Sequence, residues 1–145
     1  MKNIKIAIVG FGNIGSFLFN ELKNKSKEIQ VKTGKKISIV AISAKNINKK
    51  RKYKINKKIF FKNALDIFKK KKVDILFEVI GLADGISKKV VQLALNNRIH
   101  VITANKALIS KHGDTLSKLA ENNKVNLEFE AAVAGGIPVL RTIKD

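Results

Sequence analysis

Short apolar runs alternate along the chain with stretches in which apolar residues recur every three or four positions. Apolar runs of this length, bounded by glycine or polar residues, are typical of buried β-strands. Strands are predicted at 4–9, 37–42, 59–61, 73–80, 99–103 and 127–131. The helical spacing predicts helices at 13–25, 63–71, 85–97, 106–110, 114–122 and 139–145.

Polar residues indicate where these elements begin and end. Asn63 and Asp84 have side chains that cap helices well, so each is expected to precede a helix. Gly113 is expected to break the helical stretch near the end of the chain. The basic stretch 27–36 is expected to be an irregular connection, and 45–58 a surface excursion.

The alternation of strands with helices predicts the fold class. It is typical of βαβ units, in which the strands are parallel and helices cover both faces of the sheet. We therefore expect an α/β fold with a doubly wound parallel sheet. The length of 145 residues suits one such domain.

Three glycines follow the first predicted strand directly. Gly10, Gly12 and Gly15 match the pattern G-x-G-x-x-G between a strand and a helix, the setting in which this motif binds dinucleotides. The first glycine permits a sharp turn, the second lets a pyrophosphate approach the backbone, and the third lets the helix pack closely. The free N–H groups at the helix start favour phosphate. The motif therefore predicts a Rossmann-type dinucleotide-binding domain.

The residues after the second predicted strand bear on the choice of cofactor. A carboxylate there binds a ribose 2′-hydroxyl, whereas a basic residue accommodates a 2′-phosphate. No Asp or Glu lies between Glu28 and Asp66, and Lys45 takes this position. Further basic residues follow closely, namely Lys49, Lys50 and Arg51. NADP(H) is therefore expected to be preferred, while Asn46 leaves the use of NAD(H) open.

The chain is strongly basic, with 30 Lys and Arg residues, 11 Asp and Glu residues and a formal net charge of +19. Such a charge raises the question of nucleic-acid binding. The basic runs lack the interleaved aromatic residues on which bases stack, so nucleic acid is not the expected partner. Codon usage in an A/T-rich genome would account for the many lysines. The positive field still favours anionic ligands such as a phosphorylated cofactor.

Other classes of protein are excluded by what the sequence lacks. There is no cysteine, and therefore no disulfide framework and no thiolate metal site. No apolar stretch approaches the length of a membrane span, and the first residues do not form a signal peptide. A cytoplasmic protein is expected.

Two segments carry patterns more specific than the glycine motif. Residues 100–108 read HVITANKAL, and residues 129–138 read FEAAVAGGIP. Together with residues 10–15 and with residues 77–81, which read FEVIG, in this order and spacing, they resemble homoserine dehydrogenase over the whole chain. The resemblance implies an NAD(P)-dependent oxidoreductase that interconverts aspartate 4-semialdehyde and homoserine, on the route to threonine, methionine and isoleucine.

The resemblance also implies which residues bind the cofactor. They are Gly10, Phe11, Gly12, Asn13, Ile14, Gly15, Ala44, Lys45, Ile80, Gly81, Thr103 and Lys106. Lys106 would be the catalytic residue of this chain, with an ammonium group that polarises a substrate oxygen or holds the nicotinamide ribose. Open parallel sheets bind ligands at the carboxyl ends of their strands, which independently favours this arrangement.

A loop near the end of the chain resembles the monovalent-cation site of the family. Its sodium-binding backbone carbonyls would be those of Glu130, Val133, Gly135 and Ile137. Carbonyl oxygens suit hard cations. The residues alone indicate only a glycine turn before a helix with Pro138 near its start. His100 and His112 carry no ligand pattern and are expected to be structural.

The resemblance ends where the substrate domain of the family begins. Residues 1–135 are expected to form the NAD(P)-binding domain and 136–145 the start of the connection to a missing substrate domain. The chain is therefore expected to be truncated and inactive alone, with the general acid outside it, and the full-length protein to be a homodimer. The alternative is a stand-alone nucleotide-sensing regulatory module, which would leave the segments around Lys106 and Pro138 without a role.

Overall fold

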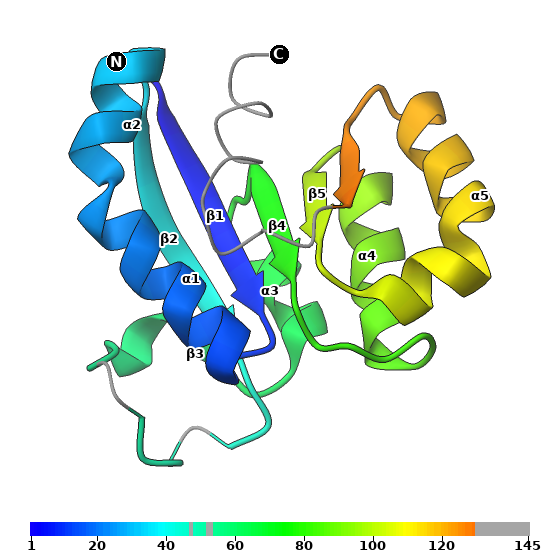
Figure 1. The fold of residues 1–145 in the computed structure, drawn as a ribbon, viewed down its shortest axis with the longest axis horizontal. Helices are drawn as coiled ribbons and strands as arrows, with labels where there is room; N and C mark the ends of the chain where they lie inside the picture. The colour runs from blue at the N-terminus through cyan, green and yellow to red at the C-terminus, as the bar shows by residue number, and fades with distance from the viewer. Residues whose placement is uncertain (47, 52–53, 130–145) are drawn as a thin grey trace.

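A six-stranded parallel sheet forms the centre of the molecule in the computed structural model, which describes residues 1–46, 48–51 and 54–129 (Figure 1). Its strands are β1 (Asn3–Val9), β2 (Lys36–Ser43), β3 (Phe60–Phe61), β4 (Ile75–Glu78), β5 (His100–Thr103) and β6 (Leu127–Phe129). They lie in the order β3-β2-β1-β4-β5-β6, and neighbouring strands pair in parallel. This order confirms the predicted doubly wound, Rossmann-type α/β fold.

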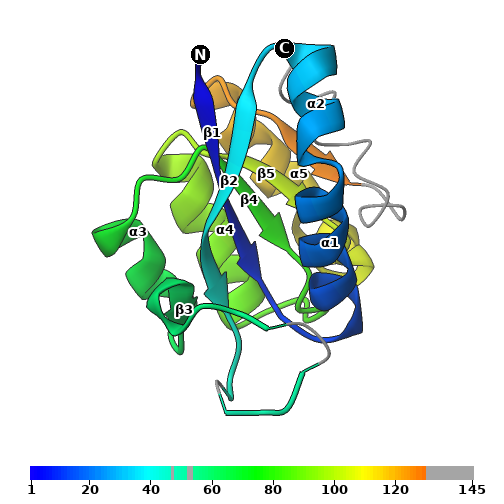
Figure 2. The same cartoon turned by 90° about the vertical axis from the view of Figure 1, so that its left-hand side faces the viewer.

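Helices cover both faces of the sheet (Figure 2). They are α1 (Asn13–Asn24), α2 (Ser26–Thr33), α3 (Ile67–Lys70), α4 (Ile86–Asn96) and α5 (Lys106–Asn122), with short 3-10 turns η1 (Lys57–Ile59) and η2 (Ala64–Asp66). Helices α1 and α2 lie on one face, and α3, α4 and α5 lie on the other. Among the described residues, no helix has both the length and the apolar character that crossing a bilayer requires.

The two faces of β1 each supply a separate hydrophobic core. Because successive side chains of a strand point to opposite faces, Ile6 and Ile8 pack with the apolar residues of α1, whereas Ala7 and Val9 pack with those of α4 and α5. All four side chains are buried. A strand buried on both faces has a continuous apolar sequence, which explains the unbroken apolar run at residues 6–9.

The basic stretch 27–36 is not an irregular connection, so that prediction was wrong. It forms most of α2, which ends at Gly34 in the left-handed conformation (φ +71°). The helix has only two apolar residues, the buried Ile29 and the exposed Val31, so it has almost no apolar periodicity. An ion pair between Glu28 and Lys32, at 2.6 Å and one helical turn apart, supports it instead.

The predicted helix break at Gly113 was also wrong, because α5 runs without interruption through this residue. A glycine inside a helix costs about 1 kcal/mol relative to alanine. Burial of Leu108, Leu116 and Ala120 on one side of α5 offsets that cost. Tertiary packing thus overrides the local preference of a single glycine.

Two further boundaries differ from the sequence prediction in detail. Asn63 does act as a cap, since its side chain accepts a hydrogen bond from the Leu65 N–H at 3.0 Å, but the segment after it divides into η2 and the short helix α3. The predicted strand 73–80 is observed as the shorter β4. The predicted turn and helix after residue 134 lie outside the described residues.

Candidate dinucleotide-binding site

The carboxyl ends of β1, β4 and β5 meet at one edge of the sheet, where a parallel doubly wound fold binds its ligands (Figure 1). The glycine turn follows β1, the segment with Ile80 and Gly81 follows β4, and Lys106 follows β5. The fold therefore brings the predicted cofactor-binding segments to the same edge.

Gly10 makes the turn between β1 and α1. Its φ of +94° is a conformation that residues with a side chain rarely adopt, and its N–H donates to the Ser43 carbonyl at 3.0 Å. A Cβ atom there would lie 2.8 Å from the Val79 carbonyl carbon. At Gly15, a Cβ atom would collide with the carbonyl oxygen of Gly10. These two glycines are needed for the fold itself, because backbone fills the space around them.

Gly12 differs, because a Cβ atom built on it would meet nothing within 4 Å. It is the N-cap of α1, whose first intrahelical hydrogen bond runs from the Ser16 N–H to the Gly12 carbonyl at 3.0 Å. The N–H groups of Asn13, Ile14 and Gly15 precede that bond, and no side chain caps the helix. Open space over uncapped N–H groups at the positive end of a helix is suited to a phosphate.

A pocket of about 300 Å³ lies beside this helix start. Its lining comes from the glycine turn, the first turns of α1 and the basic loop after β2, namely Phe11, Gly12, Asn13, Ser16, Phe17, Lys49, Lys50 and Arg51. Sequence reasoning missed Ser16 and Phe17, although helical spacing from Asn13 places them on the same side. A second pocket of about 310 Å³ lies between α1 and β2, away from the glycine turn.

Arg51 lines the first pocket and is held in place there by several contacts. Its guanidinium donates to the carbonyls of Asn46 at 2.7 Å and Lys49 at 3.0 Å. It also lies over the rings of Phe11 and Phe60, at 5.7 and 5.0 Å from their centroids. Such cation–π contacts orient the cation without neutralising it. Three basic residues, Lys49, Lys50 and Arg51, belong to the lining of this pocket.

Ala44 and Lys45 directly follow β2, as predicted, but neither lines this pocket. The Lys45 side chain is exposed, and Ala44 packs against the hydrophobic core beneath. The basic groups that the structure brings to the pocket are those of Lys49, Lys50 and Arg51.

A buried polar network joins the ends of β4 and β5. The carboxylate of Glu78 is fully buried and accepts hydrogen bonds from the Ile80 N–H at 2.8 Å and the Thr103 hydroxyl at 2.7 Å. The Asn105 side-chain amide donates to it at 3.4 Å, and the Asn105 N–H donates to the Thr103 hydroxyl at 2.9 Å. The Thr103 side chain, predicted to bind cofactor, is thus buried within this network.

Lys106 begins α5 at the same edge. Its side chain is exposed, and within the described part of the chain its ammonium group makes no hydrogen bond or ion pair. Asn105, the residue before it, caps α5 by accepting a hydrogen bond from the Leu108 N–H at 3.0 Å. Asn105 and Glu78 lie in the segments 100–108 and 77–81 that the sequence singled out. The hydrogen bond that joins them is seen only in the structure.

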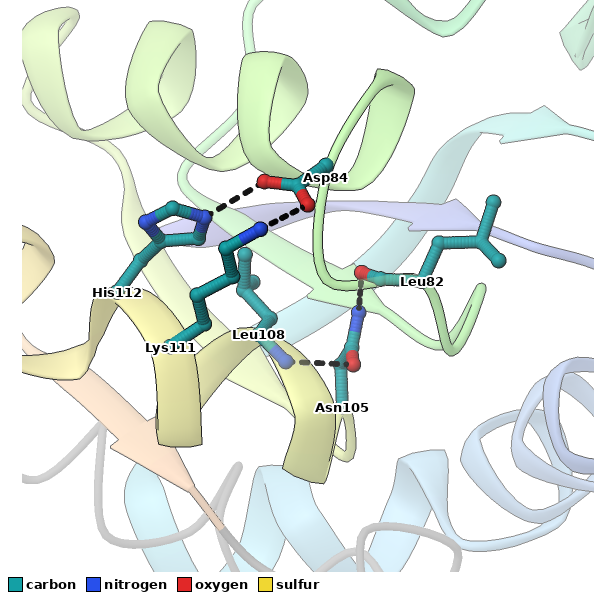
Figure 3. A network of polar contacts seen from close by, with 6 residues as sticks. All are labelled: Leu82, Asp84, Asn105, Leu108, Lys111 and His112. Atoms are coloured by element: carbon teal, nitrogen blue, oxygen red, sulfur yellow. Dashed lines mark hydrogen bonds and ion pairs between the residues drawn. The ribbon is translucent and has the colours of Figure 1, made fainter.

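Asp84 does not cap α4, so that prediction was wrong. The N-cap of α4 is Gly85, at a φ of +69°. The Asp84 carboxylate reaches across to α5 instead, where it lies 2.6 Å from the Lys111 ammonium and 2.8 Å from Nε2 of His112 (Figure 3). Its hydrogen bonds with Lys111 and then His112 lower the pKa of Asp84 below its usual range.

The two histidines make structural contacts, as predicted. His112 pairs with Asp84, and Nδ1 of the half-buried His100 accepts a hydrogen bond from the Asn126 N–H at 3.0 Å. Burial lowers the pKa of His100. Within the described residues, no group of three or more His, Cys, Asp or Glu side chains could hold a metal ion. The predicted sodium loop, with Glu130, Val133, Gly135 and Ile137, lies outside the described residues.

Comparison with known proteins gives the family. The sequence model described as "Homoserine dehydrogenase, NAD binding domain" matches residues 10–130. The chain belongs to the homoserine dehydrogenase family. The match covers the glycine turn, the basic loop and the start of α5, and it does not favour a stand-alone nucleotide-sensing module.

Individual members of the family are similar over the whole chain. Homoserine dehydrogenases of Neisseria gonorrhoeae and Bacillus subtilis are 34% and 32% identical over 145 residues. The chain spans about a third of their length, at 33% of each. A crystal structure of the Staphylococcus aureus enzyme superposes with a TM-score of 0.81 and 35% identity, over 90% of this chain and 33% of that one.

Proposed function

We propose that this chain is the cofactor-binding part of an enzyme that interconverts aspartate 4-semialdehyde and homoserine with NAD(P)H, within the synthesis of threonine, methionine and isoleucine. The proposal is supported most directly by the open, uncapped start of α1 at Gly12. Family membership supports the reaction class, and the open start of α1 supports the proposed position of the pyrophosphate.

Different residues at the sheet edge would bind different parts of the cofactor. The N–H groups of Asn13, Ile14 and Gly15 would bind the pyrophosphate, with Phe11 and Gly12 lining the approach. Ile80 and Gly81 would lie along the nicotinamide half. The bound nicotinamide supplies the hydride chemistry, and the protein orients it. Lys106, with its exposed ammonium group, would place positive charge near the reacting oxygen.

The same proposal includes a preference for NADP(H) over NAD(H). Lys49, Lys50 and Arg51 line the pocket beside the glycine turn, and Lys45 lies two residues after β2. Within the described residues 36–46, 48–51 and 54–65, every charged side chain is basic. A 2′-phosphate would therefore meet favourable charge and no carboxylate.

Several further expectations from the sequence remain predictions. These are the division near residue 135, the sodium loop, a homodimeric full-length enzyme, a general acid in another domain and a cytoplasmic location. Backbone carbonyls are suitable sodium ligands, and this chemistry is the support for the cation site.

Replacing Gly12 with alanine tests the central claim. The new methyl group meets no protein atom within 4 Å, so Gly12→Ala should fold normally while occupying the space that a pyrophosphate needs. We expect affinity for NADPH, followed by cofactor fluorescence, to fall by about tenfold, the equivalent of about 1.4 kcal/mol.

The matched control is Gly113→Ala, the same substitution inside α5 and away from the site. It should bind NADPH as the unmodified chain does. Unchanged affinity in Gly12→Ala, with a normal melting temperature, would contradict the proposed phosphate site.

A further inference from the structure

The loop after β4 is attached to the first turns of α5 at two points (Figure 3). The inner point is the side-chain amide of Asn105, which donates to the Leu82 carbonyl at 2.5 Å. The outer point is Asp84, which contacts Lys111 and His112. We call these contacts the loop clasp. They join residues more than 20 positions apart in sequence, because Asn105 and Leu82 are separated by 23 residues.

The inner point has one well-defined geometry because it is anchored in the buried network. Glu78 has no exposed surface, and a carboxylate in such a place requires hydrogen-bond donors. Asn105 supplies one donor and Thr103 another, and both are themselves buried. Moving Asn105 would therefore leave polar groups of the network without partners, which is costly.

Asn105 connects two segments that the proposed function assigns to the nicotinamide end of the cofactor. Its Oδ1 atom caps α5, and its Nδ2 atom binds the loop. Lys106 follows it directly, while Ile80 and Gly81 directly precede Leu82. One side chain thus determines where the loop lies relative to the start of α5.

We propose that the loop clasp is a positioning device for the nicotinamide half of the cofactor, and that Asn105 is its central positioning residue. This rests on the proposed function. The glycine turn and the basic pocket are formed by other residues, so binding of the adenosine and pyrophosphate portion does not depend on the clasp. The clasp therefore contributes to affinity only when the ligand carries a nicotinamide ring.

The test compares NADPH with 2′-phospho-ADP-ribose, which lacks the nicotinamide ring, by calorimetry on the full chain. Asn105→Ser keeps a hydroxyl that can cap α5 but is too short to reach the Leu82 carbonyl. We expect it to bind NADPH about tenfold more weakly, of the order that loss of one buried hydrogen bond produces, and 2′-phospho-ADP-ribose unchanged.

Two further variants keep the test decisive. Asn63→Ser removes the same side chain from another cap, that of η2, and should leave both affinities unchanged. Asp84→Ala removes the outer contacts from an exposed position, so it should fold even where Asn105→Ser does not. It should weaken NADPH binding by about threefold, as expected for an exposed ion pair, with no effect on 2′-phospho-ADP-ribose.

The outcomes separate this inference from the proposed function. Selective weakening of NADPH in the clasp variants supports the clasp. Equal affinities in all variants, or equal weakening of both ligands, overturns the clasp while leaving the dinucleotide site intact. An unmodified chain that binds neither ligand overturns the proposed function, and the clasp with it.

Discussion

Gly10 and Gly12 belong to one motif, but the space around a side chain would differ greatly between the two positions. Gly10 has a positive φ and backbone atoms of Val79 and Ile80 within 3 Å of any Cβ, whereas Gly12 faces open space. Strain from a disallowed conformation costs of order 1–3 kcal/mol, so a side chain at Gly10 would damage the fold. A side chain at Gly12 would meet no protein atom within 4 Å and would occupy only the space of the proposed phosphate site. The motif therefore combines two glycines that the fold requires, Gly10 and Gly15, with one that the proposed site requires.

At the residue scale, His100 makes stability depend on pH. Burial lowers its pKa, so the unfolded chain binds a proton at higher pH than the folded chain does. Stability is then present in full above the unfolded pKa of about 6.5 and is lost as the pH falls below it. Protonation also removes the acceptor at Nδ1 for the Asn126 N–H.

The measurement is the melting temperature between about pH 8 and 5, on the two sides of the ordinary histidine pKa. His100→Phe lacks the titrating group and should lose less stability over this range than the unmodified chain. Comparing slopes cancels the contribution of other groups, including the nearby Asp74 and Lys2, which also act on His100. Parallel slopes in the two proteins would refute the role of His100.

At the element scale, α5 contributes in two ways. Its buried side packs on the sheet, and its N-terminal turns hold the β4–α4 loop through Asn105, Lys111 and His112 (Figure 3). Neither contribution requires the glycine at position 113. A Cβ atom there would be 3.4 Å from the side chain of Ile109, which is an ordinary van der Waals contact.

We therefore expect Gly113→Ala to raise the free energy of unfolding by about 0.5–1 kcal/mol, because alanine loses less backbone entropy in a helix. Urea unfolding followed by circular dichroism measures this change. Gly34→Ala is the contrasting control, since Gly34 also lies in open space but has a φ of +71° and should lose stability when replaced. Destabilisation by Gly113→Ala would mean that α5 needs its glycine.

At the scale of the whole molecule, the charge of +19 opposes the compact state. The described ion pairs are few and mostly exposed, such as Glu21 with Lys25 and Glu28 with Lys32, so they offset little of this repulsion. Screening by salt should therefore stabilise the protein.

We expect the melting temperature to rise by a few degrees as salt increases from about 0.1 to 1 M, over which the Debye length falls from about 10 to 3 Å. Sodium chloride and choline chloride screen alike, so equal increases identify charge repulsion as the cause. An additional increase with sodium alone would point to the predicted cation loop. A melting temperature that stays constant in both salts would contradict the repulsion.

The strands, the parallel fold, the glycine turn and the family could all be inferred from the sequence alone. These depend on local properties: an apolar run must be buried, and G-x-G-x-x-G after a strand constrains the backbone through its immediate neighbours. Local sequence preference gave the wrong secondary structure in two places. In α2 an exposed ion pair supports a helix that has little apolar periodicity, and in α5 tertiary packing keeps the helix intact at Gly113.

Which distant side chains contact one another became clear from the packed molecule alone. It placed Arg51 against Phe11 and Phe60, Asp84 against α5 rather than at the cap of α4, and Asn105 against Leu82. Each of these contacts depends on how whole strands and helices pack. No local pattern encodes such a meeting, because the partners are brought together by the burial of other residues.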